Sequence, residues 1–341
     1  MEAIMKIIIR RNAETALYAA KELKKYIELV DSEVKCEITE DKNAEGIHLG
    51  LLCDFGLDES DVSDAMIDDV VDAKVDSLKG YIAGSNVRSI LFGVYKYLKS
   101  VGCRWVRPGA DGEYIPKANL RSHAFTYRKK ADFPFRGQAI EGAIGFEHVR
   151  DMVLWMPKVD MNLFQMEQVV PYAYMSRWYT HLNNTKLPHD DIPYADYEKY
   201  CLDLEKLINK VGLQLHALGH GAITEPFGVR YMCDGWDYDI PKEYETAFAL
   251  VDGNRDRVKK YPFYTQVCMS KEWVQDKIVE WIIDYMKKKP HIDFLHFWLG
   301  DSINNHCECE ECVKKHPSDW YVDMLNKLDK RLTEENNPAK I

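Results

Sequence analysis

Short apolar segments with β propensity alternate with longer segments of helical periodicity from about residue 130 onward, and this alternation limits the possible folds most. Four segments have the composition of buried strands: FRGQAIEGA (135–143), NLFQMEQVV (162–170), LQLHALGHG (213–221) and IDFLHFWLGD (292–301). Apolar residues recur at helical spacing to about residue 158 and over about 194–211, 270–289 and 317–335. Strands that alternate with helices form parallel βα units. The sequence therefore predicts an α/β fold.

A second α/β pattern precedes these units. Strands are predicted at 4–10, 34–39, 47–53 and 79–85, and helices over about 16–30 and 86–101. Ser85 or Asn86 is expected to cap the second helix and Gly102 to end it. Residues 57–76 are acidic and are predicted to form a surface excursion. We expect a small α/β domain over residues 1–125 and a (β/α) barrel of the TIM type from 130 to 341.

The number of βα units predicts only part of a barrel. Four units fit before residue 341, whereas a closed barrel of this type has eight strands. The final residues, Ala339–Ile341, resemble the start of a fifth strand. We therefore expect that residues 130–341 form the N-terminal half of a (β/α)8 barrel and that the chain is a fragment.

Charge and motifs exclude several classes of function. The formal net charge of −10 argues against nucleic acid or an anionic membrane as a partner. No segment reaches the roughly 18 apolar residues of a membrane span, and the N-terminal apolar run is too short for a signal peptide. Nine mostly scattered cysteines predict a reducing, cytoplasmic compartment, unless a signal peptide has been removed. Phosphate-binding and nucleophile-elbow motifs are lacking, so no organic cofactor is expected.

The resemblance to known families rests first on GYIAGSNVRSILFGVYKYLKSVGCRWVRPGADGEYIP (80–116). This stretch resembles the accessory N-terminal domain that precedes the barrel in β-hexosaminidases and α-glucuronidases. Four barrel segments resemble the first four hexosaminidase strands: FRG (135–137), KVDMNLFQM (158–166), ALGHG (217–221) and WLGDS (298–302). The whole pattern, especially WLGDSINNHCECEEC (298–312), is similar to the family of unknown function numbered 4838. Some members of that family are classed as endo-β-N-acetylglucosaminidases.

Carboxylates near strand ends are the catalytic candidates that this resemblance implies, because glycoside hydrolysis uses two carboxyl groups or one with the substrate acetamide. Asp301 ends an apolar strand and either acts in catalysis or caps the next helix. Glu141 lies at the end of the first strand. Glu167 lies inside the second and either faces the barrel mouth or forms an ion pair. The hexosaminidase pair is Asp-Glu, whereas Ser302 follows Asp301, so the acid is expected to be Asp301 or a residue of another strand.

Substrate-binding candidates come from the first and third strands and from two long loops at about 171–193 and 220–269. Arg136 either holds sugar hydroxyls, as the resemblance implies, or forms a structural ion pair. His216 and His220 should share a strand face, with His220 the better candidate, and His296 should belong to the core. The aromatic residues Trp178, Tyr179 and Trp236 either stack on sugar rings or pin their own loops, and Asn183 and Asn184 could bind hydroxyls.

The tightest local cluster is HCECEECVKKH (306–316). Cys307, Cys309 and Cys312 with His316 would satisfy a tetrahedral zinc ion that fastens the loop after Asp301. Reduced cysteines without a metal are the alternative. The other cysteines, 36, 53, 103, 201, 233 and 268, are predicted to be buried.

Taken with the resemblance, these residues predict a retaining glycoside hydrolase acting on glycans with β-linked N-acetylglucosamine. The substrate acetamide can assist this mechanism, and Asp301 would act as polariser or acid. One alternative is a non-catalytic carbohydrate-binding protein on a degenerate barrel. Another is an α-glucuronidase-type hydrolase, which would need a basic cluster for the substrate carboxylate. A carbohydrate is the expected partner in each case. The sequence does not determine the oligomeric state.

Overall fold

The structure is a computed structural model. It describes residues 4–140, 144–168, 175–176, 178–181, 184, 186–190, 192–229, 240–256 and 262–341. The chain divides into two compact units that interleave along the sequence. The first contains residues 1–138, 147–164 and 206–213, and the second contains residues 139–146, 165–205 and 214–341.

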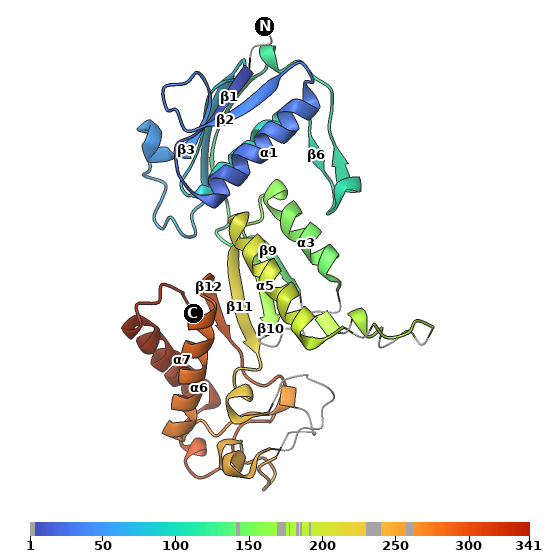
Figure 1. The fold of residues 1–341 in the computed structure, drawn as a ribbon. Coiled ribbons are helices and arrows are strands. Elements are labelled where there is room, and N and C mark those ends of the chain that lie inside the picture. Colours follow the sequence, from blue (N-terminus) through green and yellow to red (C-terminus); the bar gives the residue numbers. More distant parts are fainter. Residues whose placement is uncertain are drawn as a thin grey trace. The chain divides into compact units, whose positions relative to one another are not determined.

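The first unit is built on a mixed six-stranded sheet (Figure 1). Its strands, in the order β2-β1-β3-β5-β4-β8, are β2 (Lys35–Thr39), β1 (Ile4–Ile9), β3 (Gly46–Leu51), β5 (Lys79–Gly84), β4 (Val70–Asp76) and β8 (Ala124–Lys130). The first four run parallel, and β4 and β8 are antiparallel to their neighbours. Helices α1 (Glu14–Val30) and α2 (Val87–Val101) pack on the sheet and on each other. A small two-stranded sheet, β6 (Arg104–Trp105) with β7 (Glu113–Tyr114), also belongs to this unit.

The ends of α2 confirm a prediction from local sequence. Asn86 is the N-cap, and its side-chain oxygen accepts a hydrogen bond from the backbone N–H of Ser89 at 2.8 Å. Gly102 ends the helix with φ +112°, a left-handed conformation that costs glycine little. The apolar face between them, including Ile90, Leu91 and Leu98, is buried against the sheet. Capping and periodicity therefore suffice to define this helix.

The prediction that residues 57–76 form a surface excursion is wrong in part, because β4 occupies Val70–Asp76 inside the sheet. Its apolar side chains are buried, and the charge that made the segment look exposed is paired. Asp72 accepts hydrogen bonds from the Tyr81 hydroxyl at 3.0 Å and from Arg128 on β8 at 2.8 Å. Acidic composition concealed the alternation of apolar residues that a half-buried strand requires.

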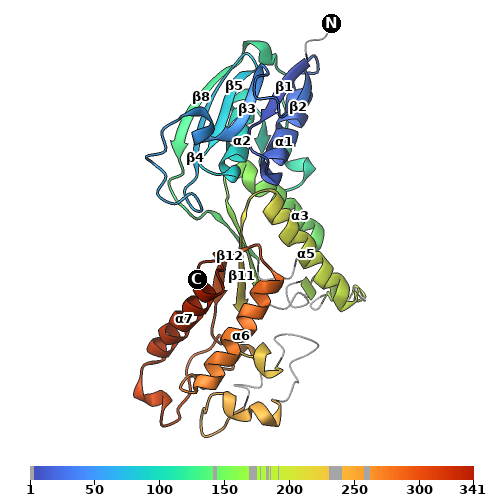
Figure 2. The ribbon, with the colours of Figure 1, turned by 60° about the vertical axis from the view of Figure 1, so that its left-hand side comes forward.

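The second sheet follows chain order, β9-β10-β11-β12. Its strands are β9 (Gly137–Ile140), β10 (Leu163–Gln168), β11 (Gln214–His220) and β12 (Ile292–Phe297), and helices α3 (Phe146–Trp155), α5 (Tyr194–Lys210), α6 (Glu272–Lys288) and α7 (Pro317–Glu334) alternate with them. β11 and β12 are parallel. Figure 2 shows α6 and α7 side by side, and these two helices contact each other. The α/β class and the order of βα units are confirmed.

Beyond α7 the chain returns to the edge of this sheet. Lys340 forms a parallel bridge with Phe294, in which the Leu295 N–H donates to the Lys340 carbonyl at 2.7 Å and the Lys340 N–H donates to the Asp293 carbonyl at 3.0 Å. The predicted start of a fifth strand therefore pairs at the position that the next barrel strand would take.

Candidate functional site

A row of histidine and aromatic side chains lies on one face of β11 and β12. Leu295 and Phe297 are buried on the opposite face of β12, where the Phe297 ring stacks on Tyr321 of α7 with centroids 6.1 Å apart. Side chains alternate along a strand, so Phe294, His296 and Trp298 point away from α7. His216 and His220 of β11 contact this second set. The row consists of His216, Phe294, His296, Trp298 and His220.

His216 and His296 form a neutral pair. Their Nδ1 and Nε2 atoms lie 2.9 Å apart, and the ring of His216 stacks on Phe294 with centroids 4.5 Å apart. Burial, with a smaller contribution from His296, lowers the pKa of His216 to about 4, and burial also lowers the pKa of His296. Near neutral pH one imidazole therefore donates and the other accepts. His296, predicted to belong to the core, is partly exposed.

His220 lies at the end of β11 between two aromatic rings. Its centroid is 4.8 Å from Phe263 and 5.0 Å from Trp298, and both contacts are edge-on. The Nδ1 atom is 3.1 Å from the Leu299 carbonyl oxygen. A carbonyl can only accept, so Nδ1 carries the proton in this bond. We call the group of His220, Phe263 and Trp298 the aromatic cup.

Asp301 is exposed on the loop that follows β12, on a backbone that is well anchored. Its N–H donates to the Phe263 carbonyl at 2.9 Å, and the Asn305 side chain donates to the carbonyls of Tyr264 and Gly300. A Cβ atom at Gly300 would lie 2.8 Å from the Thr265 carbonyl oxygen, so the two segments approach closely. We call residues 298–305 the site loop.

The alternative in which Asp301 caps the following helix is wrong. The next α-helix, α7, begins at Pro317, and its N-cap is His316. Asp301 lies four residues beyond the end of β12, with its side chain in solvent. An exposed carboxylate on an anchored loop is available to a ligand.

The other carboxylate candidates differ in placement. Glu167 is buried in β10, and the backbone of Gly219 in β11 lies against it: a Cβ atom there would be 1.8 Å from the Glu167 carbonyl oxygen. Gly219 has φ +62°, and Leu218 before it has φ +93°, a strained value for a residue with a side chain. Glu141 lies outside the described residues, as do Asn183 and Trp236.

Arg136 is held in an ion-pair network of the first unit. Its Nη2 atom is 2.8 Å from Asp69, its Nε donates to the Asp160 carbonyl at 2.7 Å, and its Nη1 donates to the Phe133 carbonyl. Asp69 is also bound by Arg88 at 2.8 Å and by Asn162. All three guanidinium nitrogens of Arg136 are engaged, which favours the ion-pair alternative over the sugar clamp.

Asp69 itself is 3% exposed and ionised. Burial would raise its pKa, but Arg88, Arg136 and Asn86 outweigh burial, so the pKa lies below its ordinary value. The sequence offered no signal for this residue, because its partners are distant in the chain.

The two described aromatic candidates of the 171–193 loop differ in exposure. Trp178 is 51% exposed, although its indole lies close to Gly145. The Tyr179 hydroxyl accepts a hydrogen bond from the Phe146 N–H at 2.9 Å, and its ring contacts Tyr197 edge-on at 5.7 Å. Tyr179 therefore pins its loop, whereas Trp178 retains a face that a ligand could cover.

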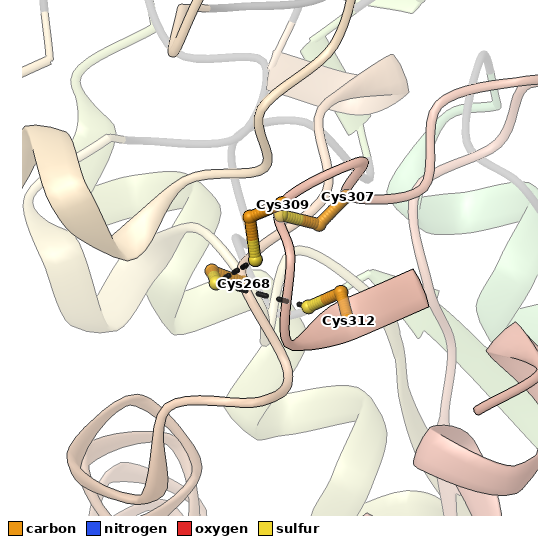
Figure 3. Close-up of side chains that lie close together, drawn as sticks. All are labelled: Cys268, Cys307, Cys309 and Cys312. Carbon is orange, nitrogen blue, oxygen red and sulfur yellow. Dashed lines mark hydrogen bonds between the residues drawn. The ribbon is translucent and has the colours of Figure 1, made fainter. Parts of the chain in front are cut away.

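Four cysteines converge behind the site loop, and one of them was not expected there (Figure 3). Cys307, Cys309 and Cys312 follow β12, as predicted, and Cys268 joins them from the segment before α6. Their sulphur atoms lie within 4.8 Å of one another. His316 caps α7 and is not part of this group. Cys268 was predicted only to be buried, because no local spacing links it to cysteines 39 to 44 residues away.

We call these four residues the cysteine group, and they could bind a metal ion. Hydrogen bonds from Cys307 and Cys312 lower the pKa of Cys268 to about 3. Outside the group, the prediction of burial holds for Cys36, Cys103 and Cys201, but Cys53 is exposed, and Cys233 lies outside the described residues.

A cavity of about 570 Å³ lies between the site loop and the start of α7. Its walls include Leu299, Ser302, His306, Lys315, Trp320 and Tyr321, together with Cys307 and Cys312 of the cysteine group. The cavity, the site loop and the cysteine group therefore form one continuous region of the second unit.

No family model matches the sequence, and no curated protein matches it. Solved structures do. A family GH115 4-O-methyl-α-glucuronidase with specificity for decorated arabinogalactans aligns with a TM-score of 0.55 at 12% identity, over 96% of this chain and 40% of that one. A Flavobacterium johnsoniae chitobiase aligns with a TM-score of 0.46 at 13% identity, over 98% and 45%. A GH138 enzyme targeting pectin rhamnogalacturonan II aligns with a TM-score of 0.49 at 10% identity, over 85% and 30%.

The fold is similar to that of a solved glycoside hydrolase. It is a mixed α/β fold similar to glycoside hydrolase TIM-barrel proteins, with the barrel covered in part. The chain spans less than half the length of these neighbours. The resemblance to family 4838 stays a prediction. Within the described ranges, no helix is long and apolar enough to cross a bilayer.

Proposed function

We propose that this chain is part of a retaining glycoside hydrolase that acts on glycans containing β-linked N-acetylglucosamine. The observation that carries the proposal is the arrangement at the ends of β11 and β12, where the backbone of the exposed residue Asp301 is hydrogen-bonded to Phe263 of the aromatic cup. Flat apolar rings match the C–H faces of sugars, and a few fixed polar groups orient them. Asp301 would polarise the substrate acetamide or act as the acid.

The proposal extends to the remaining candidates. Glu141 and Glu167 are the other carboxylates that could serve as acid, and Trp178, Asn183 and Trp236 would contact sugar on the 171–193 and 220–269 loops. A compartment that keeps thiols reduced is supported by the spacing of the nine cysteines, most of which are scattered along the sequence.

Hydrolysis of N-glycans and of a chromogenic β-N-acetylglucosaminide by the full-length protein tests this function. Asp301→Asn keeps the size of the side chain and removes its charge, and it should lower kcat/KM by about 100-fold or more. Asp329→Asn, at an exposed carboxylate of α7, is the matched control and should leave the rate unchanged. Inactivity of the wild type on both substrates, or equal rates for the two variants, would sink the proposal.

A carbohydrate-binding protein without catalysis is the second candidate. It is supported by Ser302, which follows Asp301 where the hexosaminidase pattern has its second carboxylate, and by the engagement of Arg136 in ion pairs. Calorimetric titration with the same glycans separates the two functions. Binding without release of sugar favours the second, and binding should then weaken when Trp298 is replaced by alanine.

An α-glucuronidase-type activity is the third candidate. Two basic side chains, His306 and Lys315, line the 570 Å³ cavity and could hold a uronate carboxylate. Release of glucuronic acid from a decorated arabinogalactan would favour it over the amino-sugar substrate. Loss of that release in Lys315→Ala would connect the activity to this cavity.

A metal ion in the cysteine group is proposed to be structural. Four thiolates fill a tetrahedral shell and leave no position for water or substrate, which a catalytic site requires. Such an ion would contribute to the site through the position of the loop.

A further inference from the structure

We propose that Cys268, Cys307, Cys309 and Cys312 bind one zinc ion, and that this ion fastens the site loop to the segment before α6. The metal site does not depend on the proposed hydrolase activity. It goes beyond that activity because it assigns a ligand, Cys268, that lies far from the other three in sequence.

The spacing of the sulphur atoms fits a single tetrahedral ion. A zinc–sulphur bond is about 2.3 Å, so two thiolates at corners of a regular tetrahedron are about 3.8 Å apart. The Sγ atom of Cys268 lies 3.7 Å from that of Cys309 and 3.8 Å from that of Cys312. All four sulphur atoms fall within 4.8 Å of one another. Four thiolates at this spacing need only modest adjustment to surround one zinc ion.

Other uses of the four sulphur atoms fit less well. The sulphur atom of Cys268 lies 3.7 Å from that of Cys309 and 3.8 Å from that of Cys312, whereas a disulfide bond is about 2.05 Å long, and all four cysteines are free. A cluster with several iron atoms would hold its thiolates around a wider core than one ion. The donor set consists only of sulphur, which suits zinc and disfavours magnesium or calcium.

The surroundings of the cysteine group suit thiolate ligands. The Leu250 N–H donates to the Cys307 sulphur at 3.3 Å, and the Ser270 hydroxyl lies 3.1 Å from the Cys312 sulphur. The guanidinium of Arg255 lies beside Cys268, Cys307 and Cys309, where its positive charge offsets part of the negative charge of a zinc tetrathiolate. Donors of this kind orient ligands and tune the affinity of metal sites.

Burial also separates this group from ordinary surface cysteines. Cys268, Cys307 and Cys312 are buried, and they pack with Ala249, while Cys309 is partly buried. Buried free thiols gain little free energy from lying together, whereas the ligands of one metal ion must lie together.

The ion would join the two segments that already anchor Asp301. Besides the Asp301–Phe263 hydrogen bond, the Gln266 side chain donates to the Gly300 carbonyl at 3.2 Å. Cys268 follows Gln266 by two residues, and Cys307 follows the site loop by two residues. Zinc bonds would therefore reinforce a few hydrogen bonds that are partly open to solvent, and loss of the ion should release the loop.

Metal analysis of the full chain, purified without chelators or an affinity tag, tests the site directly. We expect one zinc per chain by plasma mass spectrometry. Cobalt exchanged into the site should give the visible bands of a tetrahedral tetrathiolate. Iron at the same stoichiometry, or a metal content well below one, would overturn the assignment to zinc.

Three variants test the choice of ligand. Cys268→Ser should lower zinc content at least tenfold, whereas His316→Ala and Cys201→Ser should retain it, because His316 caps α7 and Cys201 is a buried cysteine outside the group. Retention of zinc in Cys268→Ser, or its loss in His316→Ala, would contradict the ligand set.

An experiment on the wild-type protein tests the same site if Cys268→Ser fails to fold. Titration with an organomercurial, followed with a zinc-sensitive dye, should release one zinc as the thiols of the cysteine group react. Hydrogen exchange should then accelerate in residues 262–270 and 298–312 and stay unchanged in β1, β3 and β5. Unchanged hydrogen exchange in both segments would refute the fastening role. Zinc release without any effect on glycan hydrolysis would leave the assignment of the metal site valid and would show that it is separate from the proposed function.

Discussion

Asp69 and Asp301 are both aspartates fixed by neighbouring polar groups, yet they differ in which atoms are fixed. In Asp69 the carboxylate itself is buried and bound by Arg88, Arg136 and Asn162. In Asp301 the backbone is bound, through Phe263, and within the described parts of the chain the carboxylate is exposed. The Asp69 carboxylate stabilises the fold through its ion pairs, whereas the Asp301 carboxylate remains available to contact a ligand. Anchored backbone with an unengaged charge is what a binding site needs.

The largest contrast should come from removing each carboxylate. Asp69→Ala leaves Arg88 and Arg136 without their anion in a buried site and should lower the free energy of unfolding by about 3–5 kcal/mol. Asp301→Ala removes an exposed group and should change it by less than about 0.5 kcal/mol. Urea denaturation followed by circular dichroism measures both. Similar losses in the free energy of unfolding for the two variants would contradict the view that the Asp69 carboxylate stabilises the fold and the Asp301 carboxylate does not.

A second contrast uses two glycines with the same backbone conformation, Gly219 in the second unit and Gly56 in the first, both at φ +62°. Alanine at Gly56 meets no atom within 4 Å, so only the left-handed backbone opposes it, at about 1 kcal/mol. Alanine at Gly219 also collides with the Glu167 carbonyl, and about 3 kcal/mol or more is expected. Thermal melting of the two variants compares them.

Equal melting temperatures for Gly219→Ala and Gly56→Ala would show that β10 and β11 move apart to accommodate the added methyl group without loss of stability. Because the end of β11 positions His220, we also expect Gly219→Ala to impair glycan binding, whereas Gly56→Ala should not.

The smallest expected effect is on pH dependence. The pKa of His216 is lowered to about 4 in the folded state, from about 6.5 when unfolded. A neutral His216 is therefore no burden on the folded state above pH 6.5. As the pH falls from 6.5 towards 4, the unfolded state gains a proton that the folded state resists, and the free energy of unfolding falls by at most about 3 kcal/mol. For Asp69, whose pKa is also lowered, the loss should begin only below about pH 4.

Urea denaturation at pH 7 and pH 4.5 separates these windows. The stability lost between these values should shrink in His216→Phe, which keeps the contact with Phe294 and cannot be protonated. His148→Phe, at an exposed position of α3, should lose as much as the wild type. An unchanged loss in His216→Phe would contradict the neutral histidine pair.

Local sequence predicted the elements whose signals lie within one turn or one strand. The N-cap Asn86 and the terminal Gly102 define α2, and the apolar run 292–297 defines β12. β4 was missed because its aspartates suggested solvent, and its partner Arg128 lies 56 residues away. Charges that are neutralised across a sheet cannot be distinguished in sequence from charges in water.

The candidate site was predictable in part for the same reason. The spacing of Cys307, Cys309 and Cys312 marks a possible metal site, but the fourth sulphur comes from Cys268 on another segment. The position of Arg136 at a strand start was compatible with a sugar clamp or an ion pair, and Asp69 decides in favour of the pair. Glu141, Asn183 and Trp236 remain predictions outside the described residues.

The sequence by itself determined the α/β class, the order of βα units and the cluster of three cysteines, because periodicity, capping and short spacings act between residues that are near in the chain. Only the tertiary structure decided that Cys268 completes the cysteine group, that Asp69 engages Arg136, and that the exposed residue Asp301 is anchored through its backbone to Phe263 of the aromatic cup. Each of these depends on the close approach of segments tens of residues apart, and long-range packing fixes that approach.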